Sequence, residues 1–263
     1  MNKACVLVFA GLDPSGGAGI QADITAITAW DAHALPVVTT LTVQDNDRVH
    51  AIHPVDAALI REQAEVLCAK ISVAAVKIGI VGTGDNAEAI AAVIRRLRAI
   101  NPALPVVLDP VLASGHGDPL ARDNAVAALS PLRALASLIT PNIPEAAMLC
   151  GGTDDVPQQA AILLRDCPDV LIKGGHGTGE MVVNRWFRKD GERCWSRPRV
   201  PGSFHGTGCT LAAAIAALLA SGNSMEQALD SALAWCHRTL EHAYAIAEGQ
   251  RIPDRRTAAK EMA

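Results

Sequence analysis

The chain has 263 residues, of which 50% are hydrophobic, 3% aromatic and 19% charged. That much apolar material supports a large buried core and excludes an intrinsically disordered chain. The formal net charge is −4, and no cluster of lysine and arginine is long enough to form a nucleic-acid-binding stripe. The few aromatic residues also argue against base stacking. We therefore expect a globular protein that does not bind nucleic acid.

The seven cysteines are odd in number and include no Cys-x-x-Cys pair. This usage predicts reduced thiols in a cytoplasmic protein rather than disulfides or a structural zinc site. The apolar stretches at residues 4–10 and 209–220 are too short to span a bilayer. We expect no membrane partner.

Six apolar runs along the chain predict β-strands. They lack strict alternation of polar and apolar residues, which is typical of strands buried on both faces. These runs are residues 4–10, 36–43, 74–81, 105–111, 137–140 and 170–173.

Segments with helical spacing lie between these strands. The first places Ile20, Ile24 and Ile27 on one face, and residues 59–71 and 90–97 continue the pattern. Alternation of strand and helix predicts right-handed crossovers and a mostly parallel sheet. The expected fold class is α/β, with three layers: a central sheet flanked by helices.

The last third of the chain changes pattern. Residues 181–187 and 193–200, joined by a Lys-Asp-Gly-Glu turn, predict an antiparallel hairpin. Two helices, 207–221 and 224–248, are expected to follow, and the polar tail from Gly249 is expected to fray. No repeat or linker interrupts the chain, so residues 1–263 are predicted to form a single domain.

A glycine-rich stretch, GLDPSGGAG at residues 11–19, directly follows the first predicted strand. Residues 17–22 match the Gly-x-Gly-x-x-Ala pattern of dinucleotide-binding proteins. In that fold, however, the first glycine follows the strand almost at once, without an Asp-Pro-Ser loop. A glycine turn alone and a dinucleotide site both remain open, but a loop for a small molecule is favoured.

Gln44 and Lys173 each end a predicted strand, and ligands of open α/β sheets gather at that edge. The Gln44 carboxamide offers a donor beside an acceptor, which matches the amino group and ring nitrogen of an aminopyrimidine. Lys173 would face the same ligand edge. The alternatives are an ordinary loop glutamine and a solvated lysine.

Asn142 and Glu145 lie three residues apart where a helix is expected to begin. Such a pair is typical of an N-cap with a first-turn acid. The same two oxygen-bearing side chains also suit a hydrated Mg²⁺, which keeps its waters and takes few protein ligands. Both interpretations stay open on the sequence.

The motif HGTGCT at residues 205–210 leads into an apolar helix. Gly206, Thr207 and Gly208 would expose backbone N–H groups, and the helix dipole favours an anion there. The pattern Gly-x-x-x-x-Gly-Lys-Ser/Thr occurs nowhere in the chain, so any phosphate site is not a Walker A loop.

Cys209 falls in the first turn of that helix, where a thiol pKa is expected to be lowered. A reactive cysteine usually has a histidine nearby, and His205 or His176 would serve. The alternative is a buried, unreactive thiol.

Together these stretches resemble the hydroxymethylpyrimidine/phosphomethylpyrimidine kinases of thiamin synthesis, in the ribokinase superfamily. The resemblance runs from about residue 5 to residue 247. Its carriers are GLDPSGGAGIQAD (11–23), Gln44, KIG (77–79), LDPV (108–111), GDPL (117–120), TPNIPEA (140–146), KGGH (173–176) and HGTGCTL (205–211).

The resemblance implies a ribokinase-like fold, ATP and Mg²⁺ as cofactors, and a homodimer. It implies transfer of the γ-phosphoryl of MgATP to 4-amino-5-hydroxymethyl-2-methylpyrimidine, and then to its monophosphate. By this likeness, Gly11, Asp23 and Gln44 hold the pyrimidine, Lys173 and Asp109 serve the ATP phosphates, and Asn142 and Glu145 organise Mg²⁺ through water. Gly206, Thr207, Gly208 and Cys209 form an anion hole, and Cys209 also takes the alcohol proton as a thiolate.

Several features depart from the resemblance. The loop at residues 112–116 lacks the usual lysine, Ser203 and Phe204 replace an Asn-Thr pair, and the usual Gly- and Pro-rich C-terminal ending is not recognisable. A pyridoxal kinase of the same fold is the alternative enzyme, which Cys209 in place of aspartate disfavours. A non-catalytic pyrimidine-binding regulator and a dinucleotide oxidoreductase are the alternatives from other classes.

Overall fold

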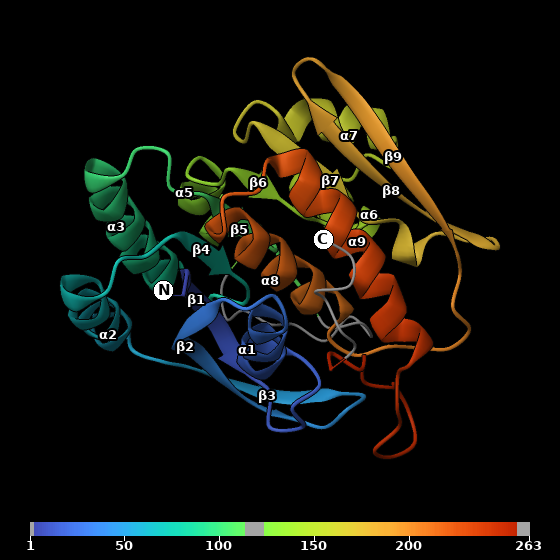
Figure 1. Ribbon diagram of the computed structural model, residues 1–263, viewed down its shortest axis with the longest axis horizontal. Helices are drawn as coiled ribbons and strands as arrows, with labels where there is room; N and C mark the ends of the chain where they lie inside the picture. The colour runs from blue at the N-terminus through green and yellow to red at the C-terminus, as the bar shows by residue number, and fades with distance from the viewer. Residues whose placement is uncertain (1–2, 114–123, 257–263) are drawn as a thin grey trace.

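A computed structural model describes residues 3–113 and 124–256 of the chain (Figure 1). The predicted GDPL motif at 117–120 and residues 114–116 of the preceding loop lie outside the described residues. Within the described part, nine strands form one sheet in the order β3-β2-β1-β4-β5-β6-β7-β8-β9. This order places the first strand in the interior of the sheet.

The six predicted strands are confirmed, with slightly different bounds. Each pairs in parallel with its neighbours of this set. They are β1 (Cys5–Leu12), β2 (His33–Gln44), β4 (Ala75–Ile78), β5 (Val106–Leu108), β6 (Leu138–Ile139) and β7 (Asp169–Ile172).

Antiparallel strands extend the sheet at both ends. The predicted hairpin is confirmed as β8 (Met181–Arg188) and β9 (Gly191–Pro198), and it pairs with β7. At the other end β3 (Val49–Pro54) pairs with β2. The strand β3 was not predicted, because its sequence contains two histidines and no buried apolar run.

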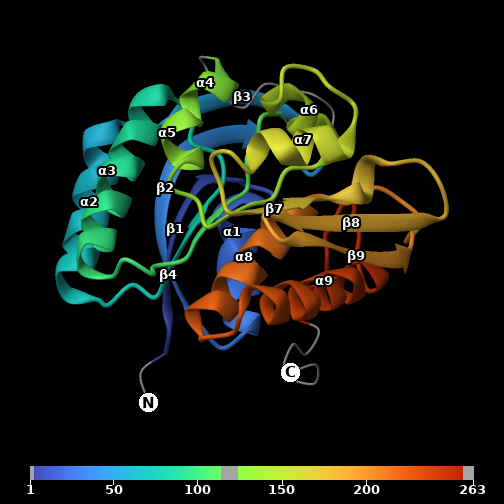
Figure 2. The ribbon, with the colours of Figure 1, turned by 90° about the horizontal axis from the view of Figure 1, so that it is seen from above.

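Helices cover both faces of the sheet (Figure 2). On one face lie α2 (Ala57–Lys70), α3 (Gly84–Ile100), α4 (Ala125–Ala128), α5 (Ser130–Arg133), α6 (Ile143–Leu149) and α7 (Val156–Leu163). On the other face lie α1 (Gly19–Ala29), α8 (Thr207–Ala220) and α9 (Met225–Glu241). The predicted three-layer α/β class is confirmed. Among the described residues, no helix combines the length and apolar character needed to cross a membrane.

The strand β1 shows why polar alternation is absent from these sequences. Val6 and Val8 belong to the apolar core shared with α1 and α8, whereas Leu7 and Phe9 belong to the core shared with α2 and α3. All four side chains are fully buried. A strand that is covered on both faces must therefore be apolar at every position.

The carboxyl ends of the parallel strands meet at one edge. The chain passes from β1 outward to β2 and β3, then returns to β4 on the other side of β1. In open α/β sheets, ligands bind in the crevice at such a reversal of strand order. The fold therefore predicts a ligand site at the loops after β1, β2, β4, β5, β6 and β7.

The end of the chain differs from the prediction. The helix α9 stops at Glu241 rather than at residue 248, and the segment beyond it turns back (Figure 1). Tyr244 pairs with Ile252, and Arg251 pairs with the backbone of Ser203 and His205. A local turn and the long-range bonds of Arg251 thus take the place of helical hydrogen bonds. The prediction that the tail frays from Gly249 is wrong as far as Arg255, which is buried.

Candidate functional site

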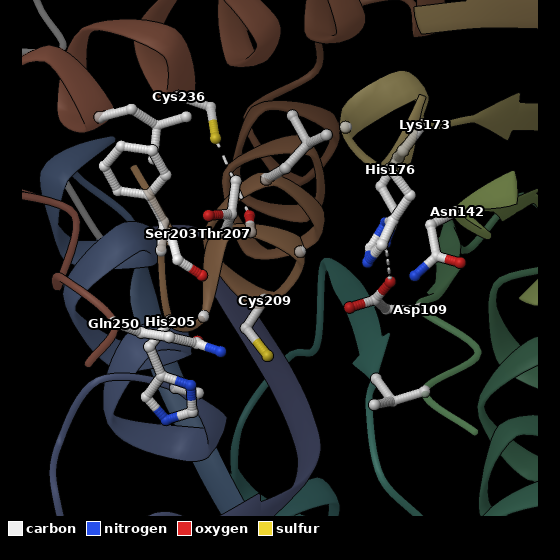
Figure 3. A pocket seen from close by; sticks show the side chains of 18 of the residues that line it. Asp109, Asn142, Lys173, His176, Ser203, His205, Thr207, Cys209, Cys236 and Gln250 are labelled. Atoms are coloured by element: carbon white, nitrogen blue, oxygen red, sulfur yellow. Dashed lines mark hydrogen bonds and ion pairs between the residues drawn. The ribbon is translucent and has the colours of Figure 1, made fainter. Parts of the chain in front are cut away.

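A cavity of about 520 Å³ lies at the carboxyl edge of the sheet (Figure 3). Ten of the eleven predicted site residues line it, and they come from six separate segments at strand ends and helix starts. These ten are Gly11, Gln44, Asp109, Asn142, Glu145, Lys173, Gly206, Thr207, Gly208 and Cys209. Figure 3 shows Cys209 with His205 on one side and the pair Asp109 and Lys173 on the other.

The loop after β1 is folded around the carboxylate of Asp13. This carboxylate accepts hydrogen bonds from the backbone of Ser15 (2.8 Å) and Ala18 (2.7 Å), and it contacts His205 Nε2 at 2.8 Å. Gly19 then begins α1 with a φ of +56°, and a Cβ there would lie 2.4 Å from the carbonyl oxygen of Gly11. The Asp-Pro-Ser stretch thus builds a specific turn, unlike the short glycine turn of a dinucleotide site.

Gln44 lies close to Asp13 and acts on its carboxylate. Burial alone would raise the pKa of Asp13, but the hydrogen bonds from His205, Gln44 and Ser15 hold it well below its usual value. Gln44 lines the cavity, and its carboxamide can offer an N–H donor and a carbonyl acceptor to a ligand.

Asp13 and His205 were not predicted as a pair. The available signal was an aspartate directly after a strand, followed by several backbone N–H groups in a glycine-rich loop. The partner histidine lies 192 residues further along the chain, so no local pattern connects the two.

Asp23 requires a correction. Its side chain is fully buried and does not line the cavity. One carboxylate oxygen accepts a hydrogen bond from Lys77 Nζ at 2.8 Å, and the other has no partner. Burial raises the pKa of Asp23 to about 6, although Lys77 opposes this shift. Asp23 thus forms a buried ion pair with Lys77 behind the cavity wall, and the predicted direct contact with a pyrimidine is not supported.

The start of α8 forms the predicted glycine turn. Gly206 has a left-handed φ of +77°, and a Cβ there would lie 2.1 Å from the carbonyl oxygen of Gly17. A Cβ on Gly208 would lie 3.1 Å from Lys173 Nζ and 3.3 Å from Asp109 Oδ2. The first N–H groups of a helix have no partner within the helix. These groups and the Lys173 ammonium therefore meet at one point of the cavity, which suits an anion.

Lys173 is held within the site by carboxylates. Its Nζ lies 2.7 Å from Asp109 Oδ1 and 4.0 Å from Glu145 Oε2. Thr140 Oγ1 donates to the same Asp109 oxygen at 3.1 Å. Burial acts to lower the pKa of Lys173, but Asp109 and Glu145 outweigh it and hold the pKa above its usual value. The structure therefore shows a charged, fixed lysine rather than a solvated one.

Asn142 and Glu145 form a complete capping box at the start of α6. The Asn142 side chain accepts from the Glu145 backbone N–H at 2.8 Å, and the Glu145 carboxylate accepts from the Asn142 backbone N–H at 2.7 Å. The capping interpretation is confirmed. Burial raises the pKa of the Glu145 carboxyl to about 7, while Lys173 acts to lower it.

The same two residues fit a hydrated magnesium ion. Both line the cavity and present oxygen donors beside the anion-binding turn. Mg²⁺ prefers oxygen ligands and usually binds through one or two protein carboxylates, several waters and the phosphates of its ligand. Within residues 3–113 and 124–256, no group of three histidine, cysteine or acidic side chains is arranged to hold a metal. The donors present suit an ion shared with a phosphate ligand.

Cys209 lies in the cavity, but the prediction of a lowered thiol pKa is wrong. Burial raises the pKa of Cys209 to about 11, and Asp23 and Asp109 add to this shift, while Lys77 opposes it. The loss of hydration on burial is the largest effect on this thiol. At neutral pH the thiol is protonated in the ligand-free protein.

Comparison with known proteins identifies the family. The family model for phosphomethylpyrimidine kinase matches residues 13–254. A hydroxymethylpyrimidine/phosphomethylpyrimidine kinase of Escherichia coli is 35% identical over 260 residues, covering 96% of each chain. A multifunctional thiamine biosynthesis protein of Corynebacterium efficiens is 37% identical over 252 residues. The match covers 93% of this chain but only about a third (34%) of that longer protein.

Solved structures confirm the predicted ribokinase-like fold. The pyridoxal kinase from Staphylococcus aureus in complex with ADP superposes with a TM-score of 0.87 at 25% identity, covering 97% of this chain and 94% of that one. The phosphomethylpyrimidine kinase from Clostridium difficile gives a TM-score of 0.76 at 32% identity, covering 89% and 98%. The fold is thus shared by kinases for two different heteroaromatic acceptors.

Proposed function

The chain belongs to the phosphomethylpyrimidine kinase family, and on that premise we propose that it phosphorylates 4-amino-5-hydroxymethyl-2-methylpyrimidine with MgATP, and then the monophosphate, in thiamin biosynthesis. One observation carries the proposal. A single cavity joins the carboxamide of Gln44 to the turn 206–208 and the fixed cation of Lys173. A side chain suited to bind an aminopyrimidine and a site suited to a phosphoryl group thus lie in the same cavity.

On the pyrimidine side, Gln44 supplies an acceptor and a donor side by side. The carbonyl oxygen accepts from the 4-amino group, and the free N–H donates to the adjacent ring nitrogen. Gly11 and Ile80 line the cavity beside it, and a Cβ on Gly11 would lie 3.5 Å from Ile80 Cδ1. These two residues leave room for a flat ring.

On the phosphoryl side, charge neutralisation is the main task. The transferred group passes through a loose transition state whose charge lies on its equatorial oxygens. Backbone N–H groups of Thr207, Gly208 and Cys209 would donate to those oxygens, and Lys173 would neutralise phosphate charge. Asp109 holds Lys173 in place before ATP arrives, so little reorganisation is needed during the reaction.

The Cys209 thiol is not a base for the proton of the acceptor alcohol in the resting site. Cys209 is a neutral thiol at pH 7, because its pKa lies near 11. A loose transition state places little demand on early deprotonation. In the second phosphorylation the acceptor is already an anionic phosphate. We therefore assign Cys209 to the anion hole through its backbone N–H and its size, rather than to thiolate base catalysis.

Asn142 and Glu145 would hold Mg²⁺ through water. The bound ion would supply neutralising charge to the ATP phosphates. Glu145 must be ionised for this role, and its pKa near 7 means that the ligand-free carboxyl is partly protonated at neutral pH. A divalent cation would favour the ionised form.

One assay tests the proposal against its alternatives. ADP release is measured with the pyrimidine alcohol, its monophosphate and pyridoxal under the same conditions. Turnover of the first two far above pyridoxal is expected. The structural likeness to the Staphylococcus aureus pyridoxal kinase makes pyridoxal the alternative acceptor. Pyridoxal as the preferred acceptor would replace the proposal, and pyrimidine binding without ADP release would indicate a regulator.

Three further properties belong to the proposal. We propose that the protein acts in the cytoplasm, that it works as a homodimer, and that residues 1–263 form one domain. Free thiols at all seven cysteines accord with a reducing compartment.

A further inference from the structure

A buried arginine lies behind the anion-binding turn without lining the cavity. Arg255 is 8% exposed, and it comes from the segment that follows α9. None of the ion pairs found among the described residues includes it, although its neighbour Arg256 pairs with Asp254. A buried guanidinium without a carboxylate partner is costly, and its retention calls for a specific reason.

Its hydrogen bonds connect the two loops that the proposed reaction uses. Arg255 Nε donates to Thr210 Oγ1 at 2.8 Å, and Nη2 donates to the carbonyl oxygen of Gly17. Thr210 Oγ1 in turn donates to the carbonyl oxygen of Gly206 at 2.8 Å. One side chain thus ties the loop after β1 to the first turn of α8.

The space around this connection is tightly filled. A Cβ on Gly206 would lie 2.1 Å from the Gly17 carbonyl oxygen and 2.9 Å from Arg255 Nη2. A Cβ on Gly17 would lie 2.4 Å from His205 Cδ2 and 3.3 Å from Ile252. The two loops therefore touch at glycines, and Arg255 supplies the hydrogen bonds that fix their separation.

The guanidinium of Arg255 also interacts electrostatically with groups near the start of α8, including Cys209. Burial lowers the pKa of Arg255, and the negative charge of Asp23 acts to raise it, as ionisation of the neutral thiols of Cys209 and Cys236 would. An arginine remains protonated under such conditions. Its charge, together with that of the helix α8 terminus, favours a phosphoryl group in front of Cys209.

We propose that Arg255 is a positioning residue that sets the separation between the pyrimidine-side loop and the anion-binding turn, so that acceptor and phosphoryl group meet in line. The proposal rests on the kinase function proposed above. Arg255 touches neither substrate. Its loss should reduce the rate of transfer, while the pyrimidine and ATP still bind to their own loops.

The test compares Arg255→Gln, Arg255→Lys and the control Arg256→Gln in the full chain. Arg256 is the next residue in the chain, and its side chain is 85% exposed. Arg256→Gln therefore makes the same chemical change in the same segment without removing a buried side chain. For each variant we measure kcat, the KM for ATP and for the pyrimidine, and the melting temperature. Arg255→Gln is expected to lower kcat at least about tenfold while each KM changes less than about threefold, and Arg255→Lys, which keeps the charge, is expected to recover part of the loss.

A purely structural role predicts a different result. It would lower the melting temperature and the yield of folded protein but leave kcat per folded molecule unchanged, and that outcome overturns the proposal. Equal losses in Arg256→Gln would also overturn it.

If Arg255→Gln does not fold, Thr210→Val removes the other end of the same connection and must show the same fall in kcat. Wild-type protein that phosphorylates no acceptor would refute the kinase function instead, which separates the two failures.

Discussion

The side chain of Gln44 lines the cavity apart from the anion-binding turn of α8, so its contribution to substrate recognition can be measured separately from the chemistry. Gln44→Ala should raise the KM for the pyrimidine by about 5- to 150-fold and leave the KM for ATP nearly unchanged. The loss corresponds to about 1–3 kcal/mol, because the polar edge of the ligand is left unpaired in a buried site. Steady-state kinetics with each substrate varied will check this. Equal changes in both KM values would show that Gln44 is only a loop residue.

The protonated thiol of Cys209 leads to a prediction about the two phosphorylation steps. Cys209→Ser keeps the backbone N–H and nearly the same size, and neither side chain is ionised at neutral pH. The alcohol step and the monophosphate step should therefore slow by factors within about threefold of each other. The two steps are assayed separately with purified acceptors. A loss at least about tenfold larger in the alcohol step would restore the thiolate base, since positioned bases contribute about 10²–10⁴-fold.

Glu145 should make stability depend on pH in a defined direction. Its folded pKa of about 7 lies above the ordinary value of 4.5, so the folded protein holds this proton more tightly than the unfolded chain. The associated stabilisation is present below about pH 4.5 and is lost as the pH rises through 7. Glu145→Gln has no such proton. The melting temperature of the variant relative to wild type should therefore rise between pH 5 and pH 8.

The same variant tests the proposed magnesium role. Activity of Glu145→Gln should fall, and raising the Mg²⁺ concentration should partly restore it. An unchanged Mg²⁺ dependence with a lower melting temperature at every pH would leave Glu145 as a helix cap alone.

At the scale of single elements, the start of α8 contains two glycines that are required for different reasons. Gly206 is required by its backbone conformation, and Gly208 by the space next to Lys173 and Asp109. Gly208→Ala should preserve or slightly raise stability, because alanine has about 1 kcal/mol more helix propensity than glycine. Its methyl group would crowd Lys173 and Asp109, so kcat should fall at least about tenfold. Gly206→Ala should lose both activity and about 1–3 kcal/mol of stability, because its φ is +77° and Gly17 blocks the Cβ. Melting curves and kinetics of the pair will separate the two effects. Full activity in Gly208→Ala would contradict the assigned position of the phosphoryl group.

The strands and helices of the parallel sheet could be predicted because hydrophobic patterning is local. The buried runs that became β1 and β7 are short, apolar and bounded by turn residues. The edge strand β3 and the end of α9 could not be predicted in this way. The strand β3 has only intermediate and exposed residues and depends on pairing with β2. The helix α9 stops at Glu241, and the segment after it pairs through Arg251 with the distant residues Ser203 and His205, which no window of sequence reveals.

At the scale of the whole molecule, Asn46 connects the loop after β2 to the segment after α9. This side chain is 6% exposed, and its Nδ2 donates to the carbonyl oxygens of Glu248 (2.9 Å) and Gln250 (3.1 Å). Asn46→Ala leaves two carbonyl groups unpaired and should cost about 1–3 kcal/mol. The melting temperature should drop by roughly 2–10 °C. The exposed Asn101 provides the control, and an equal drop in Asn101→Ala would show that the connection is unimportant.

The candidate site could be predicted to a large extent because parallel strands gather their loops at one edge. Ligand-type residues at strand ends, such as Gln44 and Lys173, therefore converge whatever their separation in sequence. The sequence could not reveal how deeply each side chain is buried or which titratable groups are charged. Asp23 belongs to the same glycine-rich motif as Gly11 but faces away from the cavity, where Lys77 neutralises it. Burial likewise reversed the expected direction of the Cys209 pKa shift.

The bond from Arg255 to Gly17 has a consequence for synthesis on the ribosome. The loop after β1 emerges among the first residues, yet the side chain that fixes it is added 238 positions later. Domains fold as their residues emerge, but contacts of such long range must wait for the later partner. A nascent chain halted before Arg255 should therefore hold its sheet while the two loops of the site are not yet held together. Such a growing polypeptide would be folded in outline but would transfer phosphoryl groups slowly until residue 255 has been added.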